Sequence, residues 1–157
     1  MNYLKALEQF LLEAKKQKGA KPAAPVAQPT TPQKKVVLDV GTFFSETARF
    51  HRKDPVVADK LQRFIDFKQE NPLAPFSKSD KPNNSEGVFA KIIPGMRHAH
   101  LTYDISVWYT ITGSNPTRLK LYAVLTHDES GTGQPAKPAK QRTVADRMQQ
   151  QSFTQVD

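Results

Sequence analysis

The sequence contains no cysteine, so disulfide bonds and thiolate metal sites are excluded. It has no uninterrupted run of about 18 apolar residues, the length that a membrane-spanning helix needs. The first eight residues mix charged and apolar side chains and do not form the apolar block of a secretory signal. These absences favour a cytoplasmic protein without a membrane segment. The length of 157 residues predicts one domain with additional tails.

Basic residues outnumber acidic ones by 23 to 15, which gives a net charge of +8. Half of this excess lies in residues 1–34, which carry six lysines and two glutamates. Positive charge attracts a protein to phosphate polymers whatever their sequence, although basic tails are also often only solubilising. The charge therefore favours nucleic-acid contact and leaves the solubilising role open.

The two ends of the chain differ from its middle. Residues 19–34 hold four prolines and little to bury, so they predict an extended basic linker between flanking segments. Residues 129–157 begin with a segment low in apolar residues and are expected to be a flexible tail, with at most a weak helix near its end. Residues 2–17 predict a helix that docks on its own domain or binds a partner, because one face carries Leu4, Leu7, Phe10, Leu11 and Ala14.

Residues 35–128 carry the pattern of one folded domain. A β-branched strand at 35–40 precedes two helices at 42–51 and 55–70, and Asp54-Pro55 is a typical start for the second helix. A polar, proline-containing loop at 72–87 follows, and then strands at 88–93, 96–101, 105–112 and 119–126. This order predicts an α+β fold with two helices packed on one face of a mostly antiparallel four- to five-stranded sheet. The other face is left for function.

Three of the four histidines are expected to converge. Alternation along residues 96–101 places His98 and His100 on the same face of a strand, and Asp104 follows at the bend before the next strand. A meander of the last three strands would bring His127, just past the final strand, towards Asp104 and His100. Three histidines and a carboxylate could also hold zinc, but their spacing matches no recognised zinc motif. We therefore expect no metal.

These residues also carry a family resemblance. The phrase from Gly95 to Thr112, with its Arg-His-Ala-His core, the Asp four residues later and an aromatic strand, is followed by a strand that ends in Thr126-His127. This pattern, over about residues 35–128, resembles the mRNA interferase toxins of the YafQ type in the RelE/ParE superfamily. The resemblance implies a RelE-like fold and a metal-independent endoribonuclease without a cofactor.

The resemblance implies attack of an RNA 2′-hydroxyl on the adjacent phosphate, leaving a 2′,3′-cyclic phosphate and a 5′-hydroxyl. mRNA, the ribosome and a small antitoxin protein are the implied partners. His127 is expected to be the general acid, and His100 and Asp104 to supply the base and its orientation, with the proton acceptor left open between them. The residues expected to contact RNA or its phosphates are Arg97, Lys81, His98 and Lys78.

The sequence departs from the family pattern in three places. Lys81 stands where a loop histidine is expected, His98 stands where an aspartate is common, and no aromatic residue follows His127 closely. A lysine is a poor base unless its pKa is strongly lowered. Two non-catalytic alternatives therefore stay open. One is a ParE-type inhibitor of DNA gyrase, and the other is a binding protein for RNA, the ribosome or a host protein whose catalysis has decayed.

Overall fold

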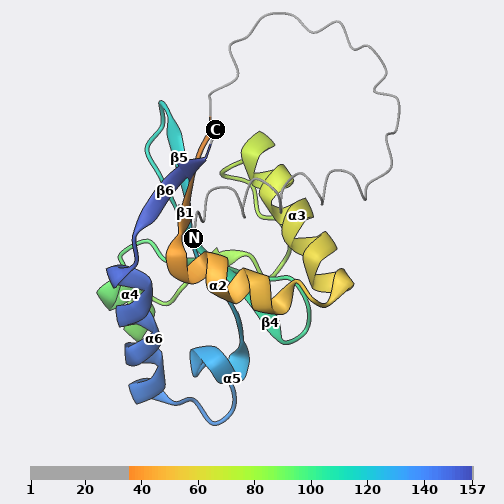
Figure 1. The fold of residues 1–157 in the computed structure, drawn as a ribbon. Helices are drawn as coiled ribbons and strands as arrows, with labels where there is room; N and C mark the ends of the chain where they lie inside the picture. The colour runs from red at the N-terminus through yellow and green to blue at the C-terminus, as the bar shows by residue number, and fades with distance from the viewer. Residues whose placement is uncertain (1–35, 157) are drawn as a thin grey trace, which may run out of the picture.

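The computed structural model describes residues 36–156, and the predicted helix at 2–17 and linker at 19–34 lie outside the described residues. One six-stranded sheet has the order β2-β3-β4-β5-β1-β6 (Figure 1). The strands are β1 (Val36–Gly41), β2 (Lys81–Pro82), β3 (Arg97–His100), β4 (Ile105–Thr112), β5 (Thr117–Thr126) and β6 (Phe153–Val156). The helices are α2 (Thr42–His51), α3 (Pro55–Glu70), α4 (Val88–Ile92), α5 (His127–Ser130) and α6 (Pro138–Gln150).

The strand pairing confirms the predicted α+β class with a mostly antiparallel sheet. β3, β4 and β5 form the expected antiparallel meander, and the turn between β4 and β5 begins at Gly113, whose φ is 75°. Between residues 36 and 156, only β1 and β5 run parallel. The meander matters for the site because it places the end of β3 and the end of β5 beside the start of β4.

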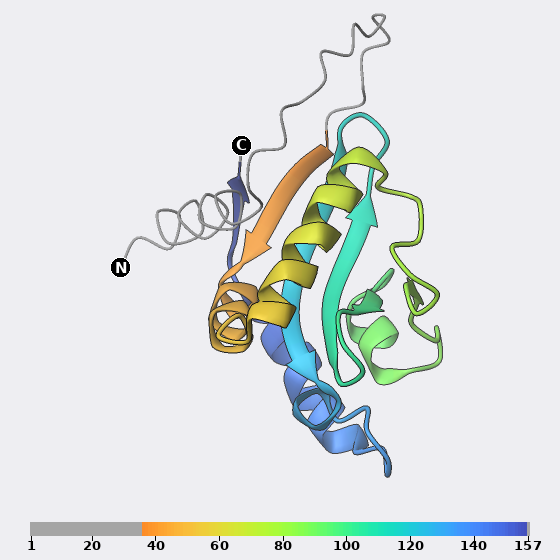
Figure 2. The ribbon, with the colours of Figure 1, turned by 90° about the vertical axis from the view of Figure 1, so that its right-hand side faces the viewer.

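α2 and α3 cover one face of the sheet as predicted, and Figure 2 looks onto α3 lying across that face. α3 begins where expected because the carboxylate of Asp54 accepts the N–H of Val56 at 2.9 Å and Pro55 occupies the first turn. The core on this side is built from residues of α2, α3 and four strands, including Phe44, Leu61, Phe64, Val107 and Leu121.

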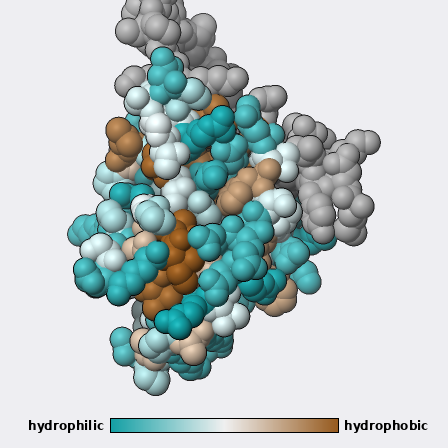
Figure 3. All heavy atoms as spheres, turned by 90° about the vertical axis from the view of Figure 1, so that its left-hand side faces the viewer, coloured by the Kyte–Doolittle hydropathy of each residue, from teal (hydrophilic) through white to brown (hydrophobic). Residues whose placement is uncertain are grey.

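The second face of the sheet is also partly covered, which differs from the expectation of an open functional face. α4 and α6 pack there around a second apolar cluster that includes Phe89, Trp108, Ala123, Ala145 and Met148. Figure 3 shows the side of the molecule that carries α4 and α6, where hydrophilic side chains surround smaller hydrophobic patches. Only the part of this face beyond the two helices remains for a site.

α4 replaces the strand that was predicted at residues 88–93. Phe89 and Ile93 are four residues apart and both are buried in the second cluster. A short apolar run fits a strand and a buried helical turn equally well, so its sequence period could not separate the two.

The segment from 129 to 156 is structured, so the expected flexible tail is wrong for these residues. α6 buries Val144, Ala145 and Met148, and β6 pairs antiparallel with β1. The spacing of these three apolar residues is helical, but the polar residues around them obscured it. None of the helices within 36–156 has the length and apolarity that crossing a membrane requires.

Beyond the end of β1, α2 takes its place beside the last residues of β5. β1 pairs with β5 only as far as Leu121, and beyond that point the N–H of Val124 donates to Oγ1 of Thr47 on α2 at 2.9 Å. The last residues of β5 are thus held between β4 and α2. This fixes the position at which the chain leaves the sheet towards His127.

Candidate active site

His100 and His127 are in direct contact. Their Nε2 atoms lie 3.4 Å apart and their ring centroids 5.2 Å apart. The register explains the contact, because His100 pairs with Ser106 near the start of β4 and Ile105 pairs with Thr126 at the end of β5. The structure therefore brings these two histidines together, as predicted.

Asp104 contacts His127 through both its main chain and its side chain. The N–H of His127 donates to the carbonyl oxygen of Asp104 at 3.0 Å and to its Oδ1 at 3.2 Å, and Nδ1 of His127 lies 3.4 Å from the same Oδ1. Within residues 36–156 the carboxylate therefore serves His127 and not His100. With Nδ1 directed at Asp104, the Nε2 of His127 faces His100.

A capping box fixes His127 at the first position of α5. The hydroxyl of Thr126 accepts the N–H of Glu129 at 3.1 Å, and Oε2 of Glu129 accepts the N–H of Thr126 at 2.9 Å. The buried His51 of α2 places its Nε2 2.8 Å from the same Glu129 oxygen. The capping box thus starts the short helix at His127, and the contact between His51 and Glu129 holds that helix against α2.

A cavity of about 440 Å³ opens beside the histidine pair. Its lining comes from β2 and the loop after it, from β3 and β4, and from the start of α5, and it includes Lys81, Asn83, His98, His100 and His127. A second cavity of about 300 Å³ lies on the Asp104 side of His127 and includes Asp128, Gln134 and Lys137 in its lining. His127 therefore belongs to the walls of both cavities.

His98 shares the face of His100, as predicted, and its pKa is strongly lowered. Burial, followed by the nearby His100 and Lys81, lowers the pKa of His98 to about 4, so its ring is neutral at pH 7. Its Nδ1 lies 2.6 Å from Oδ1 of Asn83 and donates to it, and its ring stacks on Trp108 at 5.1 Å. A neutral ring in this position shapes the cavity and supplies no positive charge.

His100 also has a lowered pKa, and burial is the main cause. The neighbouring His127 and Lys81 act in the same direction, because positive charges disfavour a second protonated ring. The backbone N–H of His100 donates to the hydroxyl of Ser79 at 3.1 Å. At neutral pH His100 is therefore an unprotonated imidazole that can accept a proton.

The three basic residues expected near the phosphate lie in different places. Lys81 is exposed on β2 and lines the cavity of the histidines. Arg97 points to the opposite face of β3, where its Nε donates to the hydroxyl of Tyr109 at 3.3 Å and its Nη2 lies 4.0 Å from Asp80. Lys78 is exposed in the preceding loop and is not among the lining residues. Of the three, only Lys81 joins the histidines.

Sequence reasoning missed the residues that hold this arrangement in place. Asp80 is buried, accepts the hydroxyl of Tyr109 and pairs with Lys68 of α3 at 2.6 Å. Asp80 immediately precedes Lys81, so the ion pair between Lys68 and Asp80 fixes the place where the chain reaches the cavity lining. The signal was Lys68 itself, since it continues the apolar face of α3 that includes Leu61, Phe64 and Ile65.

A metal site does not emerge from the geometry. Among residues 36–156, no three His, Asp or Glu side chains are arranged so that they could hold a metal ion. Two buried polar atoms in the same part of the chain, Ser106 Oγ and Trp108 Nε1, have no hydrogen-bond partner, and both residues line the histidine cavity. The chemistry available at the site is that of two imidazoles, a carboxylate and a lysine.

Comparison with known proteins gives a limited set of similarities. No family model matches the sequence and no curated protein matches it. Among solved structures, a YoeB/ParE toxin from Agrobacterium tumefaciens is similar with a TM-score of 0.46 and 20% identity, over 59% of this chain and 98% of that one. Two structures of the E. coli DinJ-YafQ toxin-antitoxin complex are similar with TM-scores of 0.44 and 0.45 and identities of 22% and 20%. They cover 58% and 61% of this chain, and 92% and 94% of theirs.

Proposed function

We propose that this protein is a toxin-type endoribonuclease that cleaves mRNA by attack of a 2′-hydroxyl on the adjacent phosphate. The observation that carries the proposal is the contact between His100 and His127, with Asp104 behind His127 and a cavity in front of the pair. Transfer of a phosphoryl group within RNA needs one group that accepts a proton and one that donates a proton. Two imidazoles in different environments meet that need at neutral pH.

In the proposed reaction His100 is the base. Its lowered pKa keeps Nε2 unprotonated, so it can accept the proton of the 2′-hydroxyl as that oxygen bonds to phosphorus. His127 is the proposed acid, because its Nδ1 faces Asp104 while its Nε2 faces His100 beside the cavity. His127 gives its proton to the 5′-oxygen as the bond from phosphorus to that oxygen breaks. The products are a 2′,3′-cyclic phosphate and a 5′-hydroxyl.

The contact between the two rings also accounts for how the site is reset. After one turnover His100 carries the proton and His127 lacks one. A separation of 3.4 Å between the Nε2 atoms allows the proton to pass back directly once the product has left. The pair thus returns to its starting state without a further residue.

Lys81 is the proposed cation for the charge that develops on the phosphate. It lines the same cavity as both rings, and a positive group at that point stabilises the pentavalent transition state. His98 is neutral and Arg97 lies on the other face, so neither takes this role. Lys81 acts as a charge and not as a base, which fits its place where the family pattern has a histidine.

The proposed partners follow from the charge and from the sequence resemblance. A net charge of +8 favours an RNA substrate through its phosphates, and the affinity should fall as salt is raised. mRNA, held on the ribosome or free, is the proposed substrate. A small antitoxin that binds this protein is the proposed inhibitor.

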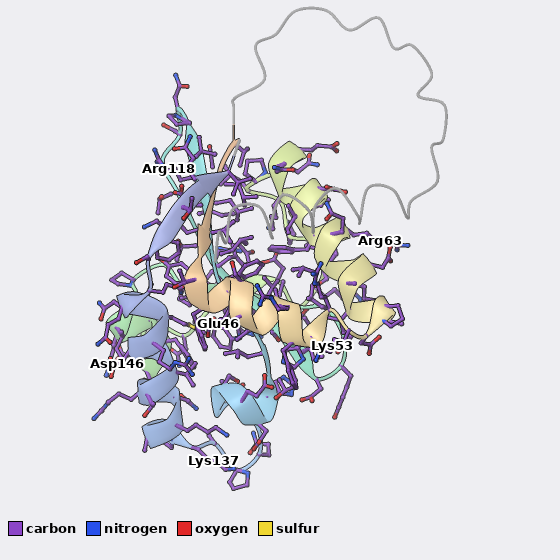
Figure 4. The ribbon with its side chains drawn as sticks, viewed as in Figure 1. Glu46, Lys53, Arg63, Arg118, Lys137 and Asp146 are labelled. Carbon is purple, nitrogen blue, oxygen red and sulfur yellow. The ribbon has the colours of Figure 1, made fainter. Side chains whose placement is uncertain are left out.

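The test is to map the ends of RNA incubated with the purified full chain. We expect cyclic phosphate at one end and a 5′-hydroxyl at the other, on mRNA undergoing translation or on free RNA, and with EDTA present. His100→Ala and His127→Ala should each lower the rate by at least about 100-fold, as loss of an acid or a base does. The matched control is Arg63→Gln, because Arg63 is an exposed basic residue on α3 (Figure 4).

Two outcomes would contradict the proposal. RNA that stays intact but is bound would support the non-catalytic binding protein. Cleavage that survives both histidine substitutions would place the active site elsewhere. Growth arrest on expression gives the same distinction in cells, since arrest that survives both substitutions is arrest by binding.

A further inference from the structure

A third cavity of about 680 Å³ lies away from the histidine pair, between α2, the end of β5 with α5, and α6. Its apolar lining comes from Phe43, Phe50, Leu125 and Val144. Phe50 is 62% exposed, which is unusual for a phenylalanine next to an apolar groove. In Figure 1, α5 and α6 lie in the lower part of the molecule and α2 lies above them. We call this cavity the α2–α6 groove.

Charges of both signs line the rim of the α2–α6 groove. Glu46 of α2, labelled in Figure 4, lies 3.7 Å from Arg147 of α6. The guanidinium of Arg147 also lies 4.3 Å above the ring of Phe43. Lys140 and Glu129 complete the charged rim. A ligand for this groove therefore needs a narrow apolar face flanked by side chains of both signs.

The chain itself contains a segment with that chemistry. Residues 2–17 lie outside the described residues, but their sequence repeats apolar side chains at helical spacing and carries both lysine and glutamate between them. A helix of 16 residues is about 24 Å long. α2 has 10 residues and α6 has 13, so by the same rise these walls of the groove are about 15 Å and about 20 Å long, somewhat shorter than the segment.

The intervening chain is long enough to reach. β1 has six residues and α2 ten, so the far end of the groove lies within about 35 Å of Val36. Residues 18–35 are proline-rich, and in an extended polyproline conformation they span about 56 Å. The tether therefore allows residues 2–17 to lie in the groove of the same molecule. Tethering also raises the effective concentration of the segment to about millimolar, which favours this occupant over a free partner.

We propose that residues 2–17 dock as an amphipathic helix in the α2–α6 groove of their own chain. The docked segment covers Phe50 and the His51–Glu129 pair, both of which belong to the groove lining. Because Glu129 caps α5, the segment lies against the group that positions His127. This inference is independent of the proposed ribonuclease activity, because it concerns only where the segment binds.

The absence of cysteine allows a direct test by disulfide crosslinking in the full chain. Leu7→Cys is combined with Thr143→Cys, since Thr143 is an exposed residue of α6 that lines the groove. The control combines Leu7→Cys with Arg63→Cys on the exposed side of α3, away from the groove (Figure 4). Under mild oxidation we expect an intramolecular bond at least about tenfold faster in the first pair than in the second.

Each alternative result overturns the proposal. Equal rates in the two pairs would mean that the segment has no preferred place. The absence of a crosslink in both would mean that it stays away from the domain. Disulfide-linked dimers specific to the Thr143 pair would show that a second copy supplies the segment.

Hydrogen exchange in the full chain gives a second readout without cysteines. Leu7→Asp/Leu11→Asp should speed exchange of the amides of α2 and α6 that line the groove by about tenfold, because the docked segment no longer protects them. Asn2→Asp/Gln9→Asp adds the same charge on the opposite side of the segment, so exchange should stay unchanged. Equal exchange in the two variants would contradict the proposal.

Discussion

The ammonium group of Lys68 lies 2.6 Å from a carboxylate oxygen of Asp80, and the two side chains are 1% and 0% exposed. Burial lowers the pKa of Lys68, while the hydrogen bond to Asp80 opposes that shift. The same ammonium donates to the carbonyl oxygen of Ala74, and Asp80 accepts the N–H of Phe76 at 2.7 Å. The pair therefore anchors the loop between α3 and β2 beneath the sheet.

Breaking this pair from one side should be costly. Lys68→Met leaves the buried Asp80 carboxylate with only the more distant Arg97, at 4.0 Å, as a cation, and we expect a loss of about 3–5 kcal/mol in the free energy of unfolding. Lys68→Met/Asp80→Asn removes both charges and should recover a large part of that loss. Urea unfolding followed by circular dichroism measures both. The control, Arg63→Met, breaks an exposed pair on the same helix and should cost less than about 1 kcal/mol. A double variant less stable than the single one would contradict the expectation.

His98 should make the stability of the fold dependent on pH. Its pKa is about 4 in the folded state against 6.5 for an ordinary histidine, so the unfolded chain binds more protons between these values. Stability is complete above pH 6.5 and decreases as the pH falls towards 4, by up to about 3 kcal/mol. Urea unfolding at pH 7 and pH 4.5 measures the loss.

His98→Gln is the variant that isolates this contribution, because it keeps a polar side chain beside Asn83 and cannot be protonated. We expect its loss of stability between pH 7 and pH 4.5 to be smaller than that of the unsubstituted protein. The single tryptophan, Trp108, stacks on His98 and reports both unfolding and protonation by its fluorescence. Equal losses in the two proteins would show that the ring of His98 is not held neutral.

Lys81 should contribute, after burial and His127, to the pH at which the proposed nuclease loses activity in acid. His100 must be unprotonated to act as base, and its lowered pKa keeps the rate high until the pH falls below the ordinary histidine value of 6.5. Lys81→Gln removes a nearby positive charge, so the pKa of His100 rises. The acidic limb of the pH–rate profile then moves to higher pH. NMR titration of His100 measures this shift even without a cleavage assay.

Lys78→Gln is the matched control for Lys81→Gln. Both lysines are exposed and belong to the same loop region, but only Lys81 lines the histidine cavity. The Lys78 variant should leave the pKa of His100 and the acidic limb unchanged. Equal shifts from both substitutions would mean that general surface charge, and not the position of Lys81, causes the change in the pKa of His100.

Glu129 should act as a positioning residue for His127. Glu129→Ala removes the capping box of α5 and the partner of His51, so we expect a loss of about 1 kcal/mol in stability and a changed environment for the His127 ring. In a cleavage assay kcat should fall more than KM rises. The ring resonances of His127 measure the change directly.

Asp128→Ala is the matched control for Glu129→Ala, because Asp128 is the adjacent acidic residue. The Asp128 carboxylate is exposed and pairs with Lys137 and Lys140 outside the capping box. This variant should leave the ring resonances of His127 and the kcat unchanged. If both substitutions moved His127 equally, the cap would not be what holds it.

The sequence was sufficient to predict that the three histidines and Asp104 converge, because strand alternation and strand order determine their positions. Alternation placed His98 and His100 together, and the meander brought His127 to Asp104. The same alternation placed Arg97 on the other side of β3, and only its match to the family pattern suggested a phosphate role. At Arg97 the alternation along the strand was therefore a better guide than the match to the family pattern.

The remaining features depend on contacts between distant segments, which local patterns do not encode. Residues 88–92 become helical because the second apolar cluster receives Phe89 and Ile93, and Val144 and Met148 of α6 pack in the same cluster. Lys68 continues the apolar face of α3, but its pairing with Asp80 spans a loop whose path the sequence does not determine. His51 pairs with Glu129, which is 78 residues away, so the local sequence around His51 does not show its structural role.

β1 lies between β5 and β6, so the first strand of the described domain is covered on one side by the last. During synthesis on the ribosome, β1 is complete more than 100 residues before the strand that protects its outer edge. A chain cut just before Phe153 would expose an apolar strand edge to other chains and would be prone to aggregate. Full-length chains are thus protected from self-association in a way that fragments lacking the final strand are not.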